Sequence, residues 1–395
     1  MDTPPTILVA CPWSPVGGGM FKVADYLIQA QADPPPPGHA RLRPLDTRGA
    51  GHAAASLGVL ARAVAQVTRA RHEGLAGVHV NLAERLSLVR KCLLVVACHR
   101  LGVPVVLHLH AAQLHRGWPR LPAPAQALVR RVFALPRCCV VLGHNAAAFV
   151  AGELGVPASR VEVVTNGVPE PGPAPARPRP AASGPLRLLF VGNLSDRKGV
   201  PELLQAMARP ELASMAVELT LAGGGDASRY QAMARALGLG PRVRFAGWAA
   251  QDEVARLLAG ADALVLPSHD EGLPLAVLEA LARGVPVVCT PVGEIPLALA
   301  DGREAWFVPP GDPAALARGL ARVLGDAALR EALRARGRAL YLRAFSMPRF
   351  FAQVADVHRR HFGVAAALAV PGAGPVPGPS GARPTSGAVR REQPA

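Results

Sequence analysis

Short apolar runs alternate with helical stretches along most of the chain. The strands of a first domain are predicted by apolar runs at 7–10, 77–80, 103–109, 138–142 and 161–164. Residues 20–30, after three glycines, predict the first helix. Continuously apolar strands that are separated by helices are typical of a parallel sheet covered on both faces. Residues 1–168 therefore predict one Rossmann-like α/β domain.

A proline-rich segment then interrupts the pattern. Residues 169–185 read PEPGPAPARPRPAASGP and predict an extended linker, because proline continues neither a helix nor a central strand. The alternation restarts with predicted strands at 186–191, 217–222, 243–245, 263–266, 285–289 and 306–308. Helices are expected at 199–208, 230–237, 252–259, 274–283 and 313–324.

Residues 186–345 thus predict a second Rossmann-like domain. Two such domains imply a cleft between the carboxyl ends of two sheets, where folds of this class bind ligands. Ser346 can cap a final helix over residues 346–362. Residues 363–395 are dominated by Ala, Pro, Gly and Ser and predict a disordered tail.

The formal charge of +15 is carried mostly by arginine, since lysine occurs only at 22, 91 and 198. This bias has two interpretations that charge alone does not separate. One is the base composition of the genome, and the other is attraction to anionic partners such as nucleotide diphosphates or anionic lipids. Nucleic acid is disfavoured, because the sequence has no zinc-finger spacing, no helix-turn-helix signal and few aromatic residues.

The six cysteines include no C-x-x-C pair, which favours reduced thiols over disulfides or a structural metal. We see no signal peptide and no apolar run of about 18 residues. A cytoplasmic location is therefore expected, with peripheral contact at the inner face of a membrane as a further option.

The apolar run 92–97 is flanked by four basic residues, Arg85, Arg90, Lys91 and Arg100. They indicate either a buried helix with charged ends or a surface for an anionic membrane.

Two carboxylates carry the clearest chemical signal. Ser268–Pro274 reads SHDEGLP, and Glu271 is separated by seven residues from Glu279. Pro274 is typical of a helix start, so the free amides after Gly272 and Leu273 offer an anion site. One carboxylate in the loop and one on the helix suit hydroxyl groups of a sugar and of a ribose.

Two cations follow the first strand of the second domain. Phe190–Gly199 reads FVGNLSDRKG, and its strand, glycine turn and helix could hold a pyrophosphate between Arg197 and Lys198. In the first domain, His108 and His110 end a predicted strand and lie on one face of it, which favours a role in a site.

These segments resemble the retaining GT-B glycosyltransferases of family 4. Glu271 and Glu279 resemble the E-x7-E motif of that family, and the resemblance covers nearly the whole chain to about residue 362. The usual G-R-L-x-x-x-K-G motif is matched except that Asn193 stands where arginine is usual. Gly18 and Gly19 resemble the N-terminal glycine loop, and His110 occupies the position of the active-site histidine. Further family segments are similar to residues 163–168, 245–248, 290–296 and 308–312.

The resemblance implies transfer of a sugar from a UDP- or GDP-sugar to a hydroxyl of a glycan or lipid-linked acceptor, with retention of configuration. It assigns the ribose to Glu279, the donor sugar to Glu271 and the diphosphate to Lys198 and Arg197. His110 would lie beside the reacting centre, and neither a cofactor nor a metal is expected.

Three alternatives remain open. They are another GT-B enzyme such as a sugar-nucleotide epimerase, a catalytically silent sugar-nucleotide-binding subunit, and a nicotinamide-dependent oxidoreductase. The last is disfavoured because neither first strand is followed by a full G-x-G-x-x-G.

Overall fold

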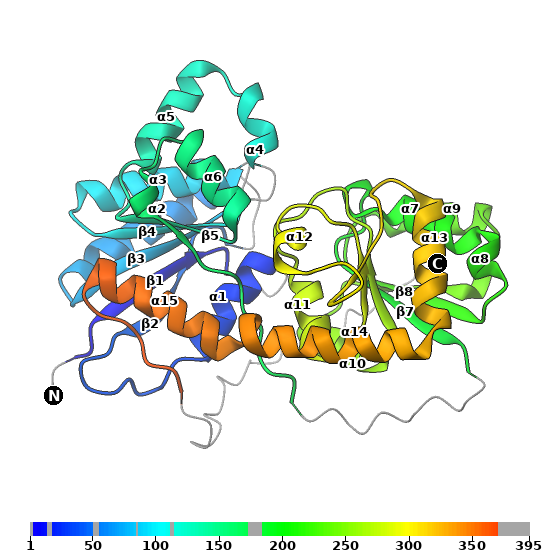
Figure 1. Ribbon diagram of the computed structural model, residues 1–395. Coiled ribbons are helices and arrows are strands. Elements are labelled where there is room, and N and C mark those ends of the chain that lie inside the picture. The colour runs from blue at the N-terminus through cyan, green and yellow to red at the C-terminus, as the bar shows by residue number, and fades with distance from the viewer. Residues whose placement is uncertain are drawn as a thin grey trace, which may run out of the picture.

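The computed structural model describes residues 3–13, 18–49, 55–83, 86–110, 114–172 and 184–369. Two parallel six-stranded sheets, each covered by helices, form two domains that lie side by side (Figure 1). The α/β class and the pair of Rossmann-like domains are thereby confirmed.

In the first domain the strand order is β2-β1-β3-β4-β5-β6. The strands are β1 (Thr6–Cys11), β2 (Arg41–Asp46), β3 (Leu75–Leu82), β4 (Val105–Leu109), β5 (Cys138–Val141) and β6 (Val161–Val163). The helices are α1 (Gly19–Gln29), α2 (Ala55–Arg71), α3 (Leu86–Arg100), α4 (Leu114–Gly117), α5 (Ala123–Phe133) and α6 (His144–Gly152).

In the second domain the order is β12-β11-β10-β7-β8-β9. The strands are β7 (Leu186–Val191), β8 (Val217–Ala222), β9 (Val243–Gly247), β10 (Ala263–Leu266), β11 (Val287–Cys289) and β12 (Trp306–Phe307). The helices are α7 (Val200–Ala208), α8 (Pro210–Ala213), α9 (Ala227–Ala236), α10 (Gln251–Gly260), α11 (Leu275–Ala282), α12 (Ile295–Ala298), α13 (Pro313–Gly325) and α14 (Ala327–Leu340).

The strand order reverses at one point in each sheet. Counted from β7, the second sheet has the 3-2-1-4-5-6 order of dinucleotide-binding folds, with the reversal between β7 and β10. In the first sheet the reversal lies between β1 and β3. Ligands of such sheets bind at the carboxyl ends of the strands that flank the reversal, so these four strands define where a site can form.

The C-terminal helix was expected to follow the second domain, and the structure shows which domain it covers. A π-helical turn, η5 (Tyr341–Phe345), joins α14 to α15 (Met347–Phe362), and this helix runs back along the first domain (Figure 1). Phe350 packs against Gly167, and Phe362 packs against Gly77 in β3. Arg360 binds both carboxylate oxygens of Glu162 in β6. The helix is therefore a structural part of the first domain.

A disordered tail was expected from residue 363 onward, but the first residues of that segment pack on the first domain. Ala365 and Ala366 are buried. The carbonyl oxygens of Ala365 and Ala367 accept hydrogen bonds from the amides of Ala40 and Ala32, at 2.9 and 2.8 Å. Small side chains let this segment pack closely on the first domain. Residues 370–395 of the predicted tail, and residues 173–183 of the predicted linker, lie outside the described residues.

All six cysteines are unpaired, and five of them are buried. Among the described residues, no helix combines the length and the apolar character that crossing a bilayer requires.

Candidate active site

The loops that follow β7 and β10 meet at the reversal of the second sheet. The β7 loop carries Arg197 and Lys198 in a short 3-10 turn, and the β10 loop carries Asp270 and Glu271. A backbone bond of 2.8 Å from the amide of His269 to the carbonyl of Arg197 joins the loops. Because β7 and β10 are neighbours in the sheet, the Arg197–Lys198 pair and the Asp270–Glu271 pair lie in one site.

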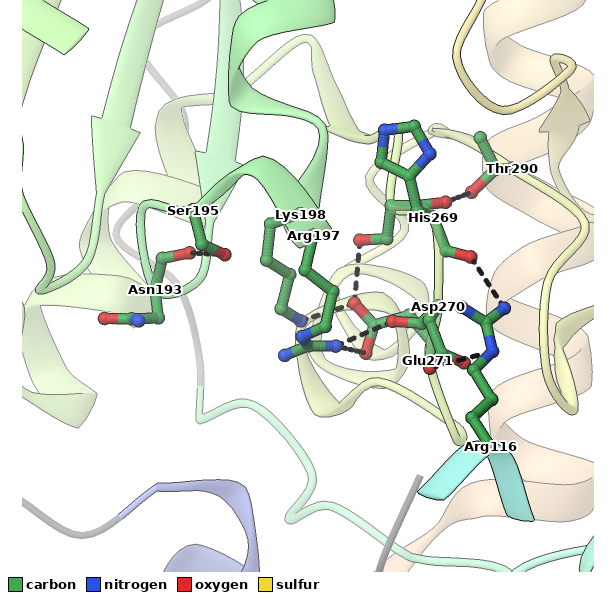
Figure 2. A network of polar contacts seen from close by, with 10 residues as sticks. Arg116, Asn193, Ser195, Arg197, Lys198, His269, Asp270, Glu271 and Thr290 are labelled. Carbon is green, nitrogen blue, oxygen red and sulfur yellow. Dashed lines mark hydrogen bonds and ion pairs between the residues drawn. The ribbon is translucent and has the colours of Figure 1, made fainter. Parts of the chain in front are cut away.

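Glu271 is the centre of this site (Figure 2). Its carboxylate is 7% exposed and forms an ion pair with the Nζ of Lys198. Ser268 Oγ donates to the same carboxylate oxygen at 2.7 Å, and Arg197 Nη1 lies 3.9 Å from the other oxygen. Arg197 also donates to the carbonyl of Asp270 at 2.7 Å. Two cations thus share one buried carboxylate, which leaves a net positive charge for an anion.

Two glycines make this close meeting of loops possible. Gly199 has φ +70°, and a Cβ there would lie 2.0 Å from the carbonyl oxygen of Pro267. Gly293 has φ +62°, and a Cβ there would lie 1.8 Å from the carbonyl oxygen of Glu271. Any other residue would push the loops apart, because both the backbone conformation and the space favour glycine.

Residues of the first domain reach the second domain at two acidic positions. Arg116 of α4 lies with its Nε 3.5 Å from Oδ2 of the buried Asp270. The carboxylate of Glu279, which is 12% exposed, accepts from Lys22 Nζ at 3.3 Å and from the Tyr26 hydroxyl at 3.1 Å. Glu279 thus lies at the domain boundary, where it lines a pocket with Tyr26 and Arg283.

A third carboxylate of the second domain binds the start of α6. Oxygens of the buried Glu294 accept from the amides of Ala146 at 3.0 Å and Asn145 at 3.5 Å. A Cβ at Gly143 would lie 2.2 Å from this carboxylate. The free amides of a helix start stabilise a negative charge, so this contact holds the domains together.

His110 lies at the carboxyl end of β4 in the first domain. Its Nε2 is 2.8 Å from Oδ1 of Asn81, and the Asn81 amide nitrogen is 3.4 Å from the carbonyl of Ala10. That arrangement makes Oδ1 the acceptor, so His110 carries its proton on Nε2. Burial, with smaller effects of His79 and Lys91, lowers the pKa of His110 to about 3. The ring is therefore neutral at pH 7, and its Nδ1 is an acceptor.

Behind His110, three buried histidines form a hydrogen-bonded chain. The rings of His108 and His110 are in contact, with centroids 4.1 Å apart and planes tilted by 34°. His108 Nδ1 lies 3.1 Å from His79 Nε2, and His79 Nδ1 lies 2.8 Å from His358 Nε2 on α15. Burial lowers the pKa of His79 to about 4 and holds those of His108 and His358 well below their usual range. Neutral imidazoles each donate once and accept once, so the chain runs in one direction.

The other residues expected in the site vary in position. Gly272 and Leu273 precede α11, which begins without a side-chain cap and leaves its first amides for an anion. Gly19 faces Leu275 at the start of that helix. Gly18 has no neighbour within 4 Å of a Cβ, and Gly17 lies outside the described residues. Asn193 is exposed and points away from the cluster around Glu271 (Figure 2).

Sequence reasoning missed the partners Arg116, Lys22, Tyr26 and Asn81. They belong to the other domain or to another strand, and no motif marks them.

Three residues of types that can bind a metal, Cys138, Glu162 and His361, place their ligand atoms within 4.8 Å of one another. Both oxygens of Glu162 are already bound by Arg360 and His361. Burial raises the pKa of the Cys138 thiol. We interpret this group as a structural contact of α15.

Family models match both domains. Residues 27–170 match Glycosyltransferase Family 4, and residues 176–340 match Glycosyl transferases group 1. The chain is 32% identical over 253 residues to a glycogen synthase of Mycobacterium tuberculosis, covering 60% of this chain and 58% of that protein. It is 36% identical over 217 residues to a D-inositol 3-phosphate glycosyltransferase of Streptomyces avermitilis, covering 50% and 46%. The chain thus spans about half the length of these relatives.

Solved structures with the same fold cover nearly the whole chain. A sucrose-phosphate synthase of Thermosynechococcus elongatus superposes with a TM-score of 0.72 at 20% identity, covering 91% of this chain and 99% of that one. Anabaena HepE in complex with UDP and glucose gives a TM-score of 0.70 at 20% identity, covering 89% and 98%. At this identity the likeness concerns the fold.

The buried histidines predict a pH dependence of stability. An unfolded histidine has a pKa near 6.5, whereas burial in the folded state lowers the pKa of His79 to about 4 and that of His110 to about 3. Between pH 6.5 and about 4 the unfolded state binds more protons, so the free energy of unfolding should fall as the pH falls. The expected loss is about 1.4 kcal/mol per pH unit for each buried histidine.

Urea unfolding at pH 7.5, 6.0 and 5.0 checks this expectation. The variant His358→Phe removes one buried imidazole, so between pH 6.0 and 5.0 it should make the slope shallower by about 1.4 kcal/mol per pH unit, with little change above pH 6.5. The exposed His72 is the matched control, and His72→Phe should leave the slope unchanged. Equal slopes for His358→Phe and the unmodified protein would contradict the conclusion that the buried histidines are neutral.

Proposed function

This chain belongs to family 4 of the GT-B glycosyltransferases, and we propose that it transfers a sugar from a nucleoside diphosphate sugar to a hydroxyl of a glycan or lipid-linked acceptor. We propose retention of the anomeric configuration. The observation that carries the proposal is the pairing of Lys198 and Arg197 around the buried Glu271 at the reversal of the second sheet. UDP- and GDP-sugars are the proposed donors, and the UDP complex of the HepE structure favours UDP.

Lys198 and Arg197 would bind the diphosphate and stabilise the charge that develops on it as the sugar leaves. Their two charges exceed the single charge of Glu271, and the free amides at the start of α11 add donors. Fixed donors aimed at a developing negative charge supply much of the rate enhancement in such reactions. Glu271 would then turn toward hydroxyls of the donor sugar, and Glu279 toward the ribose.

His110 would act from the first domain on the transferring sugar or the incoming hydroxyl. Its proton on Nε2 is held by Asn81, so Nδ1 would accept a hydrogen bond from a hydroxyl group. A neutral ring of this kind positions a hydroxyl without donating a proton. The acceptor side would thus depend on β3 and β4, and the donor side on β7 and β10.

Transfer itself separates this proposal from an epimerase and from a silent binding subunit. We expect release of free UDP or GDP from the nucleotide sugar only when an acceptor is present.

Turnover should be unchanged in EDTA, because Lys198, Arg197 and the start of α11 would take the place of a divalent cation at the diphosphate. Complete loss of turnover in EDTA, restored by a divalent ion, would contradict this electrostatic assignment.

Glu279→Gln should weaken donor binding while the fold is kept. A hydrogen bond to a charged group contributes about 1.5–3 kcal/mol, so we expect the Kd for the nucleotide sugar to rise roughly tenfold or more. Isothermal calorimetry measures it. Lys22→Met breaks the same ion pair from the other side and is the matched control. If both variants weaken donor binding equally, Glu279 acts on the domain contact and not on the ribose.

His110→Ala should lower the turnover number on the ~10²-fold scale of a positioned catalytic group. The Kd of the nucleotide sugar should change little, because Glu279 and Lys198 lie in the other domain. Single-turnover transfer measured beside donor binding separates the two effects, with the exposed His72→Ala as control. Near-normal transfer by His110→Ala would assign this histidine to packing alone.

A further inference from the structure

Exposed apolar side chains gather on three helices of the first domain. Among the described residues, eight large apolar side chains are exposed, and five of them lie on α2, α3 and α5. Leu86, Val89 and Leu93 follow one another along one side of α3 at helical spacing. Exposed fractions run from 49% to 63% for the five residues, which are Leu57, Leu86, Val89, Leu93 and Leu128.

The three helices share one face of the first sheet. Their buried residues, such as Leu60, Leu94 and Phe133, belong to one core cluster, and α3 packs against both α2 and α5. The helices α1 and α15 contribute to the other core cluster. In Figure 1, α2 and α3 lie beside each other along the sheet, with α5 next to them. The outer sides of α2, α3 and α5 therefore form one surface, which we call the α2–α3–α5 surface.

The three helices that form this surface also contain no acidic residues. The helices α2, α3 and α5 have 17, 15 and 11 residues and contain no Asp or Glu. At the average of the chain, 28 acidic residues in 395, about three would be expected. An arginine bias from base composition would add cations everywhere but would not remove carboxylates from one surface. The basic residues of the three helices are Arg62, Arg69, Arg71, Arg90, Lys91, Arg100, Arg130 and Arg131.

The basic patch expected from the sequence needs one correction. Lys91 is fully buried, and its Nζ donates to Thr47 Oγ1 at 2.6 Å, so it does not contribute to the surface. Arg85 lies outside the described residues. Arg62, Arg100 and Arg131 are exposed, and Arg90 is half-buried.

We propose that the α2–α3–α5 surface docks on an anionic membrane. Exposed leucines and a valine would enter the headgroup region, while the arginines would meet anionic lipids. Nucleic acid would use the arginines but not the five apolar side chains. A surface that binds a protein partner commonly carries charges of both signs. The combination of apolar side chains, cations and missing carboxylates therefore fits a lipid surface best.

The proposal rests on the proposed function in one respect, because it places the acceptor at the membrane. The helix α3 begins at Leu86, shortly after the carboxyl end of β3, where Asn81 binds His110. The apolar surface thus starts near the end of the sheet that would receive the acceptor. A lipid-linked acceptor could then present its sugar to His110 while its lipid stays in the bilayer.

Sedimentation of the full chain with vesicles tests the proposal without donor or acceptor. Vesicles of phosphatidylglycerol and phosphatidylcholine (3:7) should bind the chain at 0.1 M salt, and vesicles of phosphatidylcholine alone should bind far less. Arg100→Gln with Arg131→Gln should weaken partitioning roughly 25-fold, at about fivefold for each charge. Leu93→Gln with Leu128→Gln should weaken it at least tenfold, also at high salt where charge is screened.

The controls are exposed residues of the same types elsewhere. Leu297→Gln with Leu342→Gln, and Arg303→Gln with Arg359→Gln, should bind vesicles like the parent chain. Melting temperatures establish that all variants fold. No binding to phosphatidylglycerol vesicles, equal losses in the controls, or a dimer that Leu128→Gln disrupts would overturn the proposal. Tighter binding to duplex DNA than to these vesicles would also overturn it. Vesicle binding without sugar transfer would contradict only the proposed function.

Discussion

Carboxylates of the second domain that meet donors of the first domain determine how the two sheets face each other. Asp270 faces Arg116, Glu279 binds Lys22 and Tyr26, and Glu294 binds the start of α6. A buried or half-buried carboxylate is costly without a partner, so each contact favours one relative position of the domains. All three carboxylates follow β10 in sequence, as does Glu271. The segment that carries the candidate site therefore also forms the contacts between the two domains.

The same ion pairs bear on the proposed binding of a diphosphate. In the structure the carboxylate of Glu271 pairs with Lys198 and Arg197, and the carboxylate of Glu279 pairs with Lys22. A diphosphate would replace Glu271 as the partner of the two cations and free it for another hydrogen bond. On this proposal, binding would exchange one ion pair for another and would not require two solvated cations to be buried. Such an exchange would keep the desolvation cost of binding small.

The sequence predicted the buried strands and the loops after β7 and β10, because both depend on local pattern. Continuous apolar runs and glycine turns are visible without a partner. The edge strand β2 was missed because Arg41–Asp46 alternates polar and apolar residues and contains Pro44. The helix α14 was missed because it is rich in arginine and has only a narrow apolar side. Arg116, Lys22 and Asn81 could not be predicted, since they acquire partners only when separate strands or domains meet.

The histidine chain shows that the boundary between the domains in sequence is not their boundary in space. His358 follows the whole second domain in sequence, yet it binds His79 of β3. At the other end of the row of histidines, His108 binds His79 and its ring contacts that of His110. Neutral rings that each donate once can run only in one direction, so the position of α15 and the orientation of His108 depend on each other. The helix α15 also covers Gly77 and Gly167 with phenylalanine rings. The first domain is therefore complete only when residues 347–362 pack on it, and the proposed acceptor side of the cleft would be built from segments that precede and follow the second domain in sequence.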